Sequence, residues 1–570
     1  MKTKLIITLA FACLAGISYA APDVVFRAMA DELHRTMDSL TIEGMSKPYF
    51  AAYRVSDNES VTIEGEDGAL TKTSHTKNRY LTMEVRVGSM ARDNGWFAGS
   101  YTDLYNPPRN LPVEDEYSTL RHHLWLGTDK AYKNAQENLG KKNSYYQSHP
   151  GTDSLADYTT ADTTVLMQEP VTLTADTKQW EENIRAICNT VKQHAGVNEW
   201  RASYSCNMVN KRYLNSEQSK TLTGVQIQSL EISATAQATD GQRLVAFRRF
   251  YARDNDNLPS RAELLKSVNE MVNELEAMAG ANSLSEYSGP IVFTDDAAAQ
   301  LLSQVFLYNL TPNRKLIATD DDIEQRCPAG KYAQRLNRRV LPDFMTVSDD
   351  PLSQKWHNTN LIGYRLADDE GVKPQKLTLV ENGKLVSLPT TRVPMKKIPK
   401  SNGHARLLAN QWIVPSVSNI FVNAKGEVSY ENLIEKLRTM CRESGTEYGI
   451  LVKQLSDPQL AETYSWADMN FNSEKQLLTA PTIMYKVYEK DGRLEPVRGL
   501  QFDEVSIRSL RDISAVGNDE VLHNFYQPTV FFTPTMVSMV SPSYLIDEME
   551  LKALQEQEPM YKSARPVAAK

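Results

Sequence analysis

The stretch DDEGVKPQKLTLVENGKLVSLPTTRVPMKKIPKSNG, residues 368–403, decides how the rest of this chain is interpreted. Apolar residues alternate with polar ones over 377–388, on both sides of Asn382-Gly383, a dipeptide typical of two-residue hairpin turns. We therefore expect a strand, a tight turn, a second strand and a loop marked by Gly403.

The sequence around this stretch predicts more hairpins. Residues 483–497 form a second strand pair around Asp491-Gly492, and residues 430–441 have helical spacing. A short strand over 291–293 leads into a helix that carries residues 303–308. We place the main boundary at Gly289-Pro290 and expect 289–570 to be a mostly antiparallel β domain with a few helices.

Residues 21–288 predict an α+β region of antiparallel sheets with flanking helices, with a division at about residues 105–106 left open. Asp67-Gly68 and Asp240-Gly241 are turn signals, and Ser260 with Glu263 forms a capping box that starts a helix ended by Gly280. The expected helices are 26–40, 120–139, 179–194 and 261–279, and the expected strands are 49–55, 60–66, 79–87, 200–214, 225–238 and 244–251.

The first twenty residues have the pattern of a secretory signal peptide. Lys2 and Lys4 precede an apolar run over 5–17, and Ser18-Tyr19-Ala20 supplies small residues for cleavage. A lipoprotein signal at Cys13 is the alternative. No later segment is long and apolar enough to span a bilayer, so we expect an exported protein, periplasmic or extracellular, without a transmembrane segment.

Charge and cysteine content exclude some classes of function. The chain has 63 basic and 71 acidic residues, a net charge of −8, which becomes −10 once Lys2 and Lys4 are removed. This balance argues against nucleic acid as a partner. The cysteines that remain, Cys188, Cys206, Cys327 and Cys441, have no metal-binding spacing. Cys188 and Cys206 are expected to be buried, and a bridge between them stays open.

The stretch 368–403 closely resembles a segment of the TldD/PmbA peptidase family. Weaker similarities extend over most of the chain: PYFAAYRVSDNESVTIEGEDGAL (48–70), EAMAGANSLSEYSGPIVF (276–293), EPVRGLQF (495–502) and DISAVGND (512–519).

The resemblance implies a zinc site that this sequence does not preserve. Catalytic members carry His-Glu-x-x-x-His on a helix and a cysteine in the last strands. Here Ser303 and Tyr308 stand at the histidine positions and Gln304 at the glutamate, and 531–545 has no cysteine. A neutral hydroxyl and a phenol are poor zinc ligands, and an amide is no general base. An ordinary core helix is the alternative interpretation of this segment.

The resemblance also suggests a binding groove, with Asn402, Gly403, His404 and Asn419 as candidates to line it. Our leading hypothesis is a non-catalytic homologue without a cofactor, which binds a peptide or unfolded segment at a sheet edge of the C-terminal domain, or pairs with a catalytic relative or itself. An active metallopeptidase with ligands relocated to His357, His404, Cys327 or Cys441 is the second hypothesis. A structural envelope protein is the third.

Overall fold

The computed structural model describes residues 23–104, 107–150, 155–254, 256, 258–325, 330–457, 475–476, 478–503, 505–529 and 534–555. The predicted signal peptide and Cys327 lie outside these residues. Within them the α+β class is confirmed, with helices packed on antiparallel and mixed sheets.

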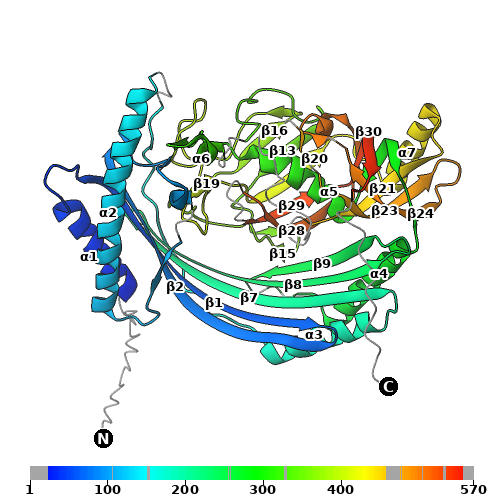
Figure 1. Cartoon of the computed structure of the whole chain (residues 1–570), viewed down its shortest axis with the longest axis horizontal. Coiled ribbons are helices and arrows are strands. Elements are labelled where there is room, and N and C mark those ends of the chain that lie inside the picture. Colours follow the sequence, from blue (N-terminus) through cyan, green and yellow to red (C-terminus); the bar gives the residue numbers. More distant parts are fainter. Residues whose placement is uncertain are drawn as a thin grey trace, which may run out of the picture.

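A long curved sheet forms the first part of the chain (Figure 1). Its strand order is β3-β2-β1-β7-β8-β6, with β5 paired to β2 and β9 paired to β8, and all pairs but β6–β8 are antiparallel. The strands are β1 (Pro48–Glu66), β2 (Ala69–Ser89), β3 (Arg92–Asp93), β5 (Arg109–Leu111), β6 (Val165–Met167), β7 (Val197–Asn215), β8 (Lys220–Gln237) and β9 (Arg243–Arg253).

Strand β1 corrects one prediction, because residues 49–55 and 60–66 belong to a single strand. Asp and Asn are rare in strands, so Asp57 and Asn58 suggested a break between two strands. In the structure the Asp57 carboxylate pairs with Arg79 of β2 and Arg212 of β7. These ion pairs satisfy the Asp57 carboxylate, so β1 continues through this position between β2 and β7.

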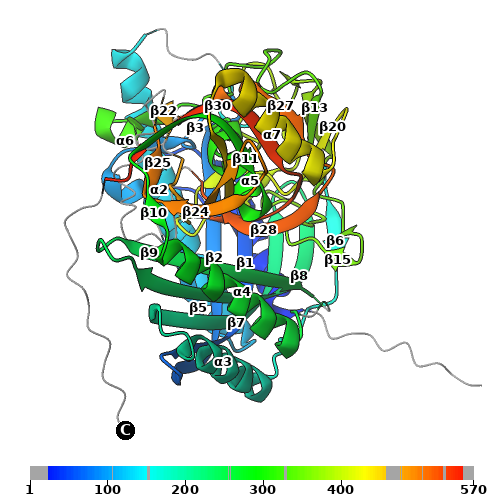
Figure 2. The ribbon, with the colours of Figure 1, turned by 90° about the vertical axis from the view of Figure 1, so that its right-hand side faces the viewer.

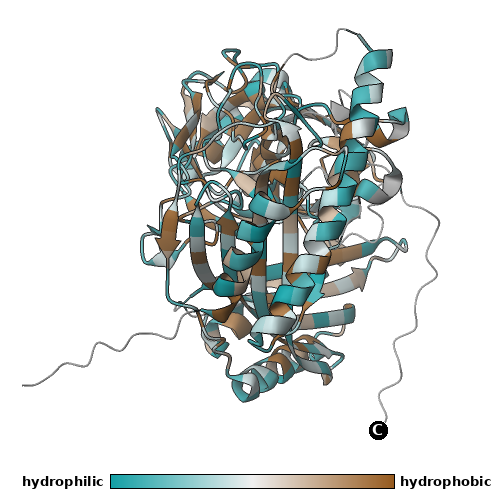
Figure 3. Cartoon of the chain, turned by 90° about the vertical axis from the view of Figure 1, so that its left-hand side faces the viewer, coloured by the Kyte–Doolittle hydropathy of each residue, from teal (hydrophilic) through white to brown (hydrophobic). Residues whose placement is uncertain are grey.

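Four helices of the described chain pack on this sheet: α1 (Val24–Ser39), α2 (Tyr117–Ser148), α3 (Thr177–Lys192) and α4 (Arg261–Ala279). Figure 2 shows α3 and α4 beside β7 and β8, and Figure 3 shows the opposite end, where α1 and α2 lie in front of the strands. The predicted capping box of Ser260 and Glu263 starts α4. None of the helices in the described part of the chain, α2 included, combines the length and hydrophobicity that crossing a bilayer needs.

The C-terminal part contains two mixed sheets around one large core. The first, ordered β10-β24-β23-β21-β11-β30-β25 with β27 on β30, comprises β10 (Asn282–Ser283), β11 (Glu286–Phe293), β21 (Tyr448–Leu455), β23 (Pro481–Tyr488), β24 (Leu494–Arg498), β25 (Leu500–Phe502), β27 (Ile513–Val516) and β30 (Tyr544–Ala553). The second, ordered β17-β16-β13-β20-β29-β28, comprises β13 (Met345–Asp349), β16 (Leu377–Glu381), β17 (Lys384–Leu385), β20 (Asn419–Ala424), β28 (Val521–Gln527) and β29 (Thr535–Ser541).

Short elements complete the C-terminal part. Residues 430–441 lie in α7 (Tyr430–Ser444), as predicted, and both predicted hairpins form, β16–β17 and β23–β24. Gly289-Pro290, where the main boundary was predicted, lies within β11. The remaining elements are α5 (Asp295–Leu301), α6 (Asp321–Gln325), β4 (Phe97–Ala98) with β12 (Ile317–Ala318), β14 (Lys355–Trp356) with β15 (Thr359–Asn360), β18 (Ala405–Leu407) with β19 (Ile413–Pro415), β22 (Lys475–Gln476) with β26 (Val505–Ser506), and 3₁₀ turns at Tyr101–Leu104, Leu307–Leu310 and Ser509–Asp512.

The stretch 368–403 attaches the C-terminal part to the curved sheet. The guanidinium of Arg54 donates to the Asp369 carbonyl at 2.7 Å, and the Lys211 amine lies 3.1 Å from the Asp369 carboxylate. The buried Arg392 pairs with Glu217 at 2.7 Å. The most distinctive stretch of the sequence therefore builds an interface between the two halves of the molecule.

Candidate functional site

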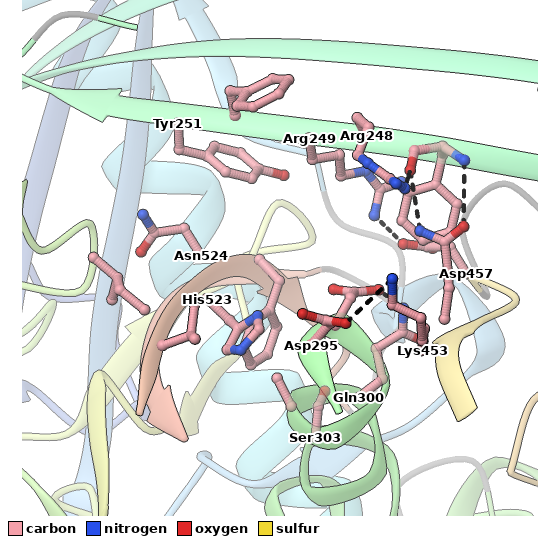
Figure 4. Close-up of a pocket in the computed structure, with 18 of the residues that line it drawn as sticks. Arg248, Arg249, Tyr251, Asp295, Gln300, Ser303, Lys453, Asp457, His523 and Asn524 are labelled. Atoms are coloured by element: carbon pink, nitrogen blue, oxygen red, sulfur yellow. Dashed lines mark hydrogen bonds and ion pairs between the residues drawn. The ribbon is translucent and has the colours of Figure 1, made fainter. Parts of the chain in front are cut away.

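A pocket of about 1030 Å³ lies between the curved sheet and the C-terminal part. Strand β9 forms one wall and strand β28 another. Helices α4 and α5, the segment after α5, and residues of β14, β15, β21 and β23 also contribute to the lining. Figure 4 shows side chains from these elements converging on the space between them. The pocket is lined by residues that lie far apart in the sequence, so only the tertiary structure forms it.

Two strand edges border the pocket. Within the described residues β9 pairs only with β8, and β28 only with β29. The main chain of Phe247 bonds the side-chain amide of Gln454, so its N–H and C=O point away from β8. Because these groups alternate along an antiparallel strand, the main chains of Arg249 and Tyr251 have the same outward direction. An open stretch of β9 edge thus borders the cavity.

The three positions at which the family resemblance places a zinc site lie together in the wall of this pocket. Ser303, Gln304 and Tyr308 all line it. Residues Leu302–Phe306 form a π-helical turn between α5 and a 3₁₀ turn, and the N–H of Leu307 donates to the Leu302 carbonyl five residues earlier. A π turn brings positions five apart onto one side of the helix, and such turns are frequent at functional sites. The core-helix interpretation is also correct in part, because Leu302, Val305 and Phe306 are buried.

The contacts of Ser303 and Gln304 show what they do in the folded chain. The Ser303 hydroxyl donates to the Gln527 side chain at 2.8 Å. The Gln304 amide donates to the Thr479 hydroxyl at 2.8 Å and accepts from the Thr479 N–H at 3.0 Å. Both side chains hold neighbouring segments in place. A hydroxyl, an amide and a phenol do not suit zinc, and Gln304 cannot take a proton from water.

The four groove candidates lie elsewhere and do not line this pocket. Asn402, His404 and Asn419 are buried. The Asn402 side chain bonds the Thr390 N–H and the Leu388 carbonyl, and Asn419 bonds the carbonyls of Asp350 and Ser353.

Gly403 is required by close packing. Its φ is +77°, and a Cβ there would lie 2.4 Å from the Cα of Pro374. His404 lies 3.4 Å from the buried Asp349. These residues fix loops inside the C-terminal part and lie outside the pocket between β9 and β28, so the groove that the resemblance suggests stays a prediction.

The relocated-ligand hypothesis finds no support among the described residues. His357 is exposed at the turn between β14 and β15, His404 is buried beside Asp349, and Cys441 is buried on α7. No three His, Cys, Asp or Glu side chains of the described chain come together in a way that could hold a metal ion. Cys188 and Cys206 are buried as expected and are not bridged.

The charged groups of the pocket wall are mostly paired with one another. Lys453 and Arg248 bond the two carboxylate oxygens of Glu274 at 2.9 Å and 2.6 Å. Burial disfavours the charged form of Glu274, but these two cations outweigh it and lower its pKa. Burial lowers the pKa of His523, against the opposing charges of Asp296 and Asp295. The His523 imidazole is therefore neutral near pH 7.

Comparison with known proteins identifies the C-terminal part. Residues 286–553 match the model of the PmbA/TldA metallopeptidase C-terminal domain. The chain is a member of the TldD/PmbA family. A metalloprotease of Archaeoglobus fulgidus is 31% identical over 104 residues, which is 18% of this chain and 23% of that protein.

Solved structures share the fold of this TldD/PmbA protein over most of its length. TldE from Thermococcus kodakarensis has a TM-score of 0.59 at 13% identity, and a candidate modulator of DNA gyrase from Thermotoga maritima has 0.59 at 12%. In both comparisons 92% of this chain and all of the other chain are covered. At this identity the likeness concerns the fold alone.

The sequence did not predict the open strand edges that form the pocket of this TldD/PmbA protein. It predicted β9 as a strand but not as an edge strand, and it did not single out Asp295, His523 or Gln454. Two signals were available. Asp295-Asp296 starts a predicted helix, and His523 is one of only nine histidines in the chain.

Proposed function

We propose that this TldD/PmbA protein binds an extended peptide or an unfolded protein segment in the pocket between β9 and β28, without hydrolysing it. One observation carries the proposal: two strand edges border a single cavity of about 1030 Å³. An exposed edge binds an extended peptide through main-chain hydrogen bonds, and alternate side chains of that peptide then enter the pocket.

The absence of catalysis is argued from chemistry at the positions of the zinc helix. Hydrolysis by a zinc peptidase needs nitrogen or thiolate ligands and a carboxylate base. Ser303, Gln304 and Tyr308 offer none of these groups, and two of them bond Gln527 and Thr479 in the protein interior. We therefore propose that the pocket binds the peptide, does not cleave it and holds no zinc ion.

Backbone-modified peptides test this proposal directly. Fluorescence anisotropy would compare a labelled extended peptide with versions N-methylated at odd or at even positions. Because a strand bonds its neighbour through alternate residues, one set should weaken binding at least about tenfold while the other leaves it nearly unchanged. Mass spectrometry should recover the peptide intact. Equal affinity of all versions, or cleavage of the peptide, would refute the proposal.

We also propose that the chain is exported and that its N-terminal signal is removed after Ala20. The support comes from Lys2, Lys4 and the apolar run that follows them. Intact mass measurement of the protein recovered from the periplasm or medium of its host should give a chain that starts at Ala21. An uncleaved chain in the cytoplasmic fraction would contradict it.

A second proposal is that this chain pairs with another TldD/PmbA chain, either a zinc-bearing relative or a second copy. The supporting observation is on α2, where the side chains of Trp125 and Leu126 are 45% and 36% exposed. Large apolar side chains exposed on a helix are frequent at interfaces. Light scattering and co-purification should show a dimer that Trp125→Glu disrupts. A wild-type chain that stays monomeric and recovers no relative would refute the pairing.

A further inference from the structure

Apart from Glu270, which lies 3.9 Å from the Lys266 amine, the charged side chains that line the pocket divide into two groups. In the first group, Arg248 and Lys453 share the Glu274 carboxylate. Arg249 pairs with Glu231 at 2.7 Å and also with Asp457. The cations of this group therefore have their charges compensated by carboxylates of the protein, and they add little net charge to the cavity.

The second group is Asp295 and Asp296, two adjacent carboxylates at the start of α5. The Asp295 carboxylate is 60% exposed and lies 3.9 Å from the Lys453 amine, which Glu274 holds more closely. The Asp296 carboxylate accepts a hydrogen bond from the neutral Gln300 amide at 2.5 Å. Both residues line the cavity, so this end of it carries an excess of negative charge.

The opposite walls add features that favour a cation over an anion. Tyr251 of β9 and Tyr526 of β28 pack edge to face across the pocket, with ring centroids 5.9 Å apart. Aromatic faces attract ammonium and guanidinium groups. His523 projects toward Asp295 in Figure 4, and as a neutral imidazole it brings no opposing charge.

We propose that the pocket selects extended peptides that carry a lysine or arginine side chain, and that the carboxylates of Asp295 and Asp296 bind the cationic group of that side chain. This inference rests on the proposed peptide binding and names the class of peptide. The edge of β9 supplies affinity that is independent of sequence, and the two carboxylates supply the preference for a basic side chain.

The test uses the full chain and one peptide framework of about seven residues, enough to span the open edge. The central residue is lysine, norleucine or glutamate, which differ in charge at similar length. Binding is measured by fluorescence anisotropy at low and at high salt. The variant is Asp295→Asn with Asp296→Asn, since Asn tolerates the φ of +50° found at Asp295. Asp343→Asn, an exposed carboxylate outside the pocket, is the matched control.

We expect the lysine peptide to bind about five- to tenfold more tightly than the norleucine peptide at low salt, and the glutamate peptide to bind least. The double variant should lose this preference and keep the norleucine affinity, while Asp343→Asn should keep both.

Binding of all three peptides with equal affinity would overturn the inference and leave the proposed function intact. No binding of any peptide would refute the proposed function itself. A preference for lysine that survives in the double variant would show that other groups select the cation.

Discussion

The side-chain amide of Gln454 makes both hydrogen bonds of a peptide group with the main chain of Phe247. Its Nε2 donates to the Phe247 carbonyl at 3.0 Å, and its Oε1 accepts from the Phe247 N–H at 3.5 Å. A side chain of the C-terminal part thus occupies the position on the β9 edge that the main chain of a bound strand would take. Gln454 marks the point where the open part of this edge ends.

Replacing Gln454 by alanine should lengthen the open edge by one residue. A bound peptide could then bond the N–H and C=O of Phe247 as well as Arg249 and Tyr251, and about 1 kcal/mol for each of these two hydrogen bonds gives roughly thirtyfold tighter binding. Anisotropy titration of one extended peptide with both proteins measures the change. Unchanged or weaker binding, with normal stability, would show that the peptide does not extend to this end of β9.

Introducing zinc ligands on the π turn should create a metal site. Ser303 and Tyr308 line the same cavity, and Ser303 contacts Gln527. We expect Ser303→His with Tyr308→His and Gln527→Cys to bind one zinc ion per chain, since three protein ligands suffice for an open zinc site. Metal analysis after dialysis measures the ratio. The single variant Ser303→His is the control and should retain none. Failure of the triple variant to bind zinc would show that the π turn no longer aligns these positions.

Glu84 should make part of the free energy of unfolding of the curved sheet depend on pH. Its carboxylate lies between Arg54 at 2.9 Å and Arg86 at 2.6 Å. Burial disfavours its charge, but Arg86 and Arg54 outweigh burial and lower its pKa to about 2. A carboxyl whose folded pKa is depressed stabilises the fold above the unfolded value of about 4.5, and this contribution disappears as the pH falls through about 2.

The variant Glu84→Gln tests this linkage. It should cost about 3 kcal/mol of unfolding free energy near pH 7, because it leaves two buried guanidiniums without their shared carboxylate. Urea titrations at several pH values should show that the difference in unfolding free energy between the two proteins decreases from about pH 4.5 to pH 2. A difference that stays constant over this range would contradict the assignment of the acid sensitivity to Glu84.

Gly371 should be essential for docking the C-terminal part onto the curved sheet. Its φ is +75°, and a Cβ there would lie 2.3 Å from a ring carbon of Tyr213. Gly371→Ala should therefore cost about 3 kcal/mol, the sum of backbone strain and overpacking. The matched control is Gly426→Ala, where φ is +76° and no atom lies within 4 Å of the added Cβ. It should cost about 1 kcal/mol, and equal losses in thermal or urea unfolding would exclude the contact with Tyr213.

The sequence by itself determined the local structure of this protein and the side chains that stand at the predicted zinc positions. The turns at Asp67-Gly68 and Asn382-Gly383 and the capping box of Ser260 formed as predicted, because their hydrogen bonds close within a few residues. The identities of Ser303, Gln304 and Tyr308 alone argue against zinc, since donor chemistry does not depend on the fold.

Only the tertiary structure decided where the pocket lies and which residues line it. Whether a strand is paired on one side or both depends on partners that are distant in the sequence, so the open edges of β9 and β28 have no local signature. For the same reason Asn402 and His404, which come from the most distinctive stretch, are interior residues, whereas Asp295 and Gln454 border the cavity. Local hydrogen bonding is encoded within a few residues, and the burial that forms a pocket is encoded by the whole chain.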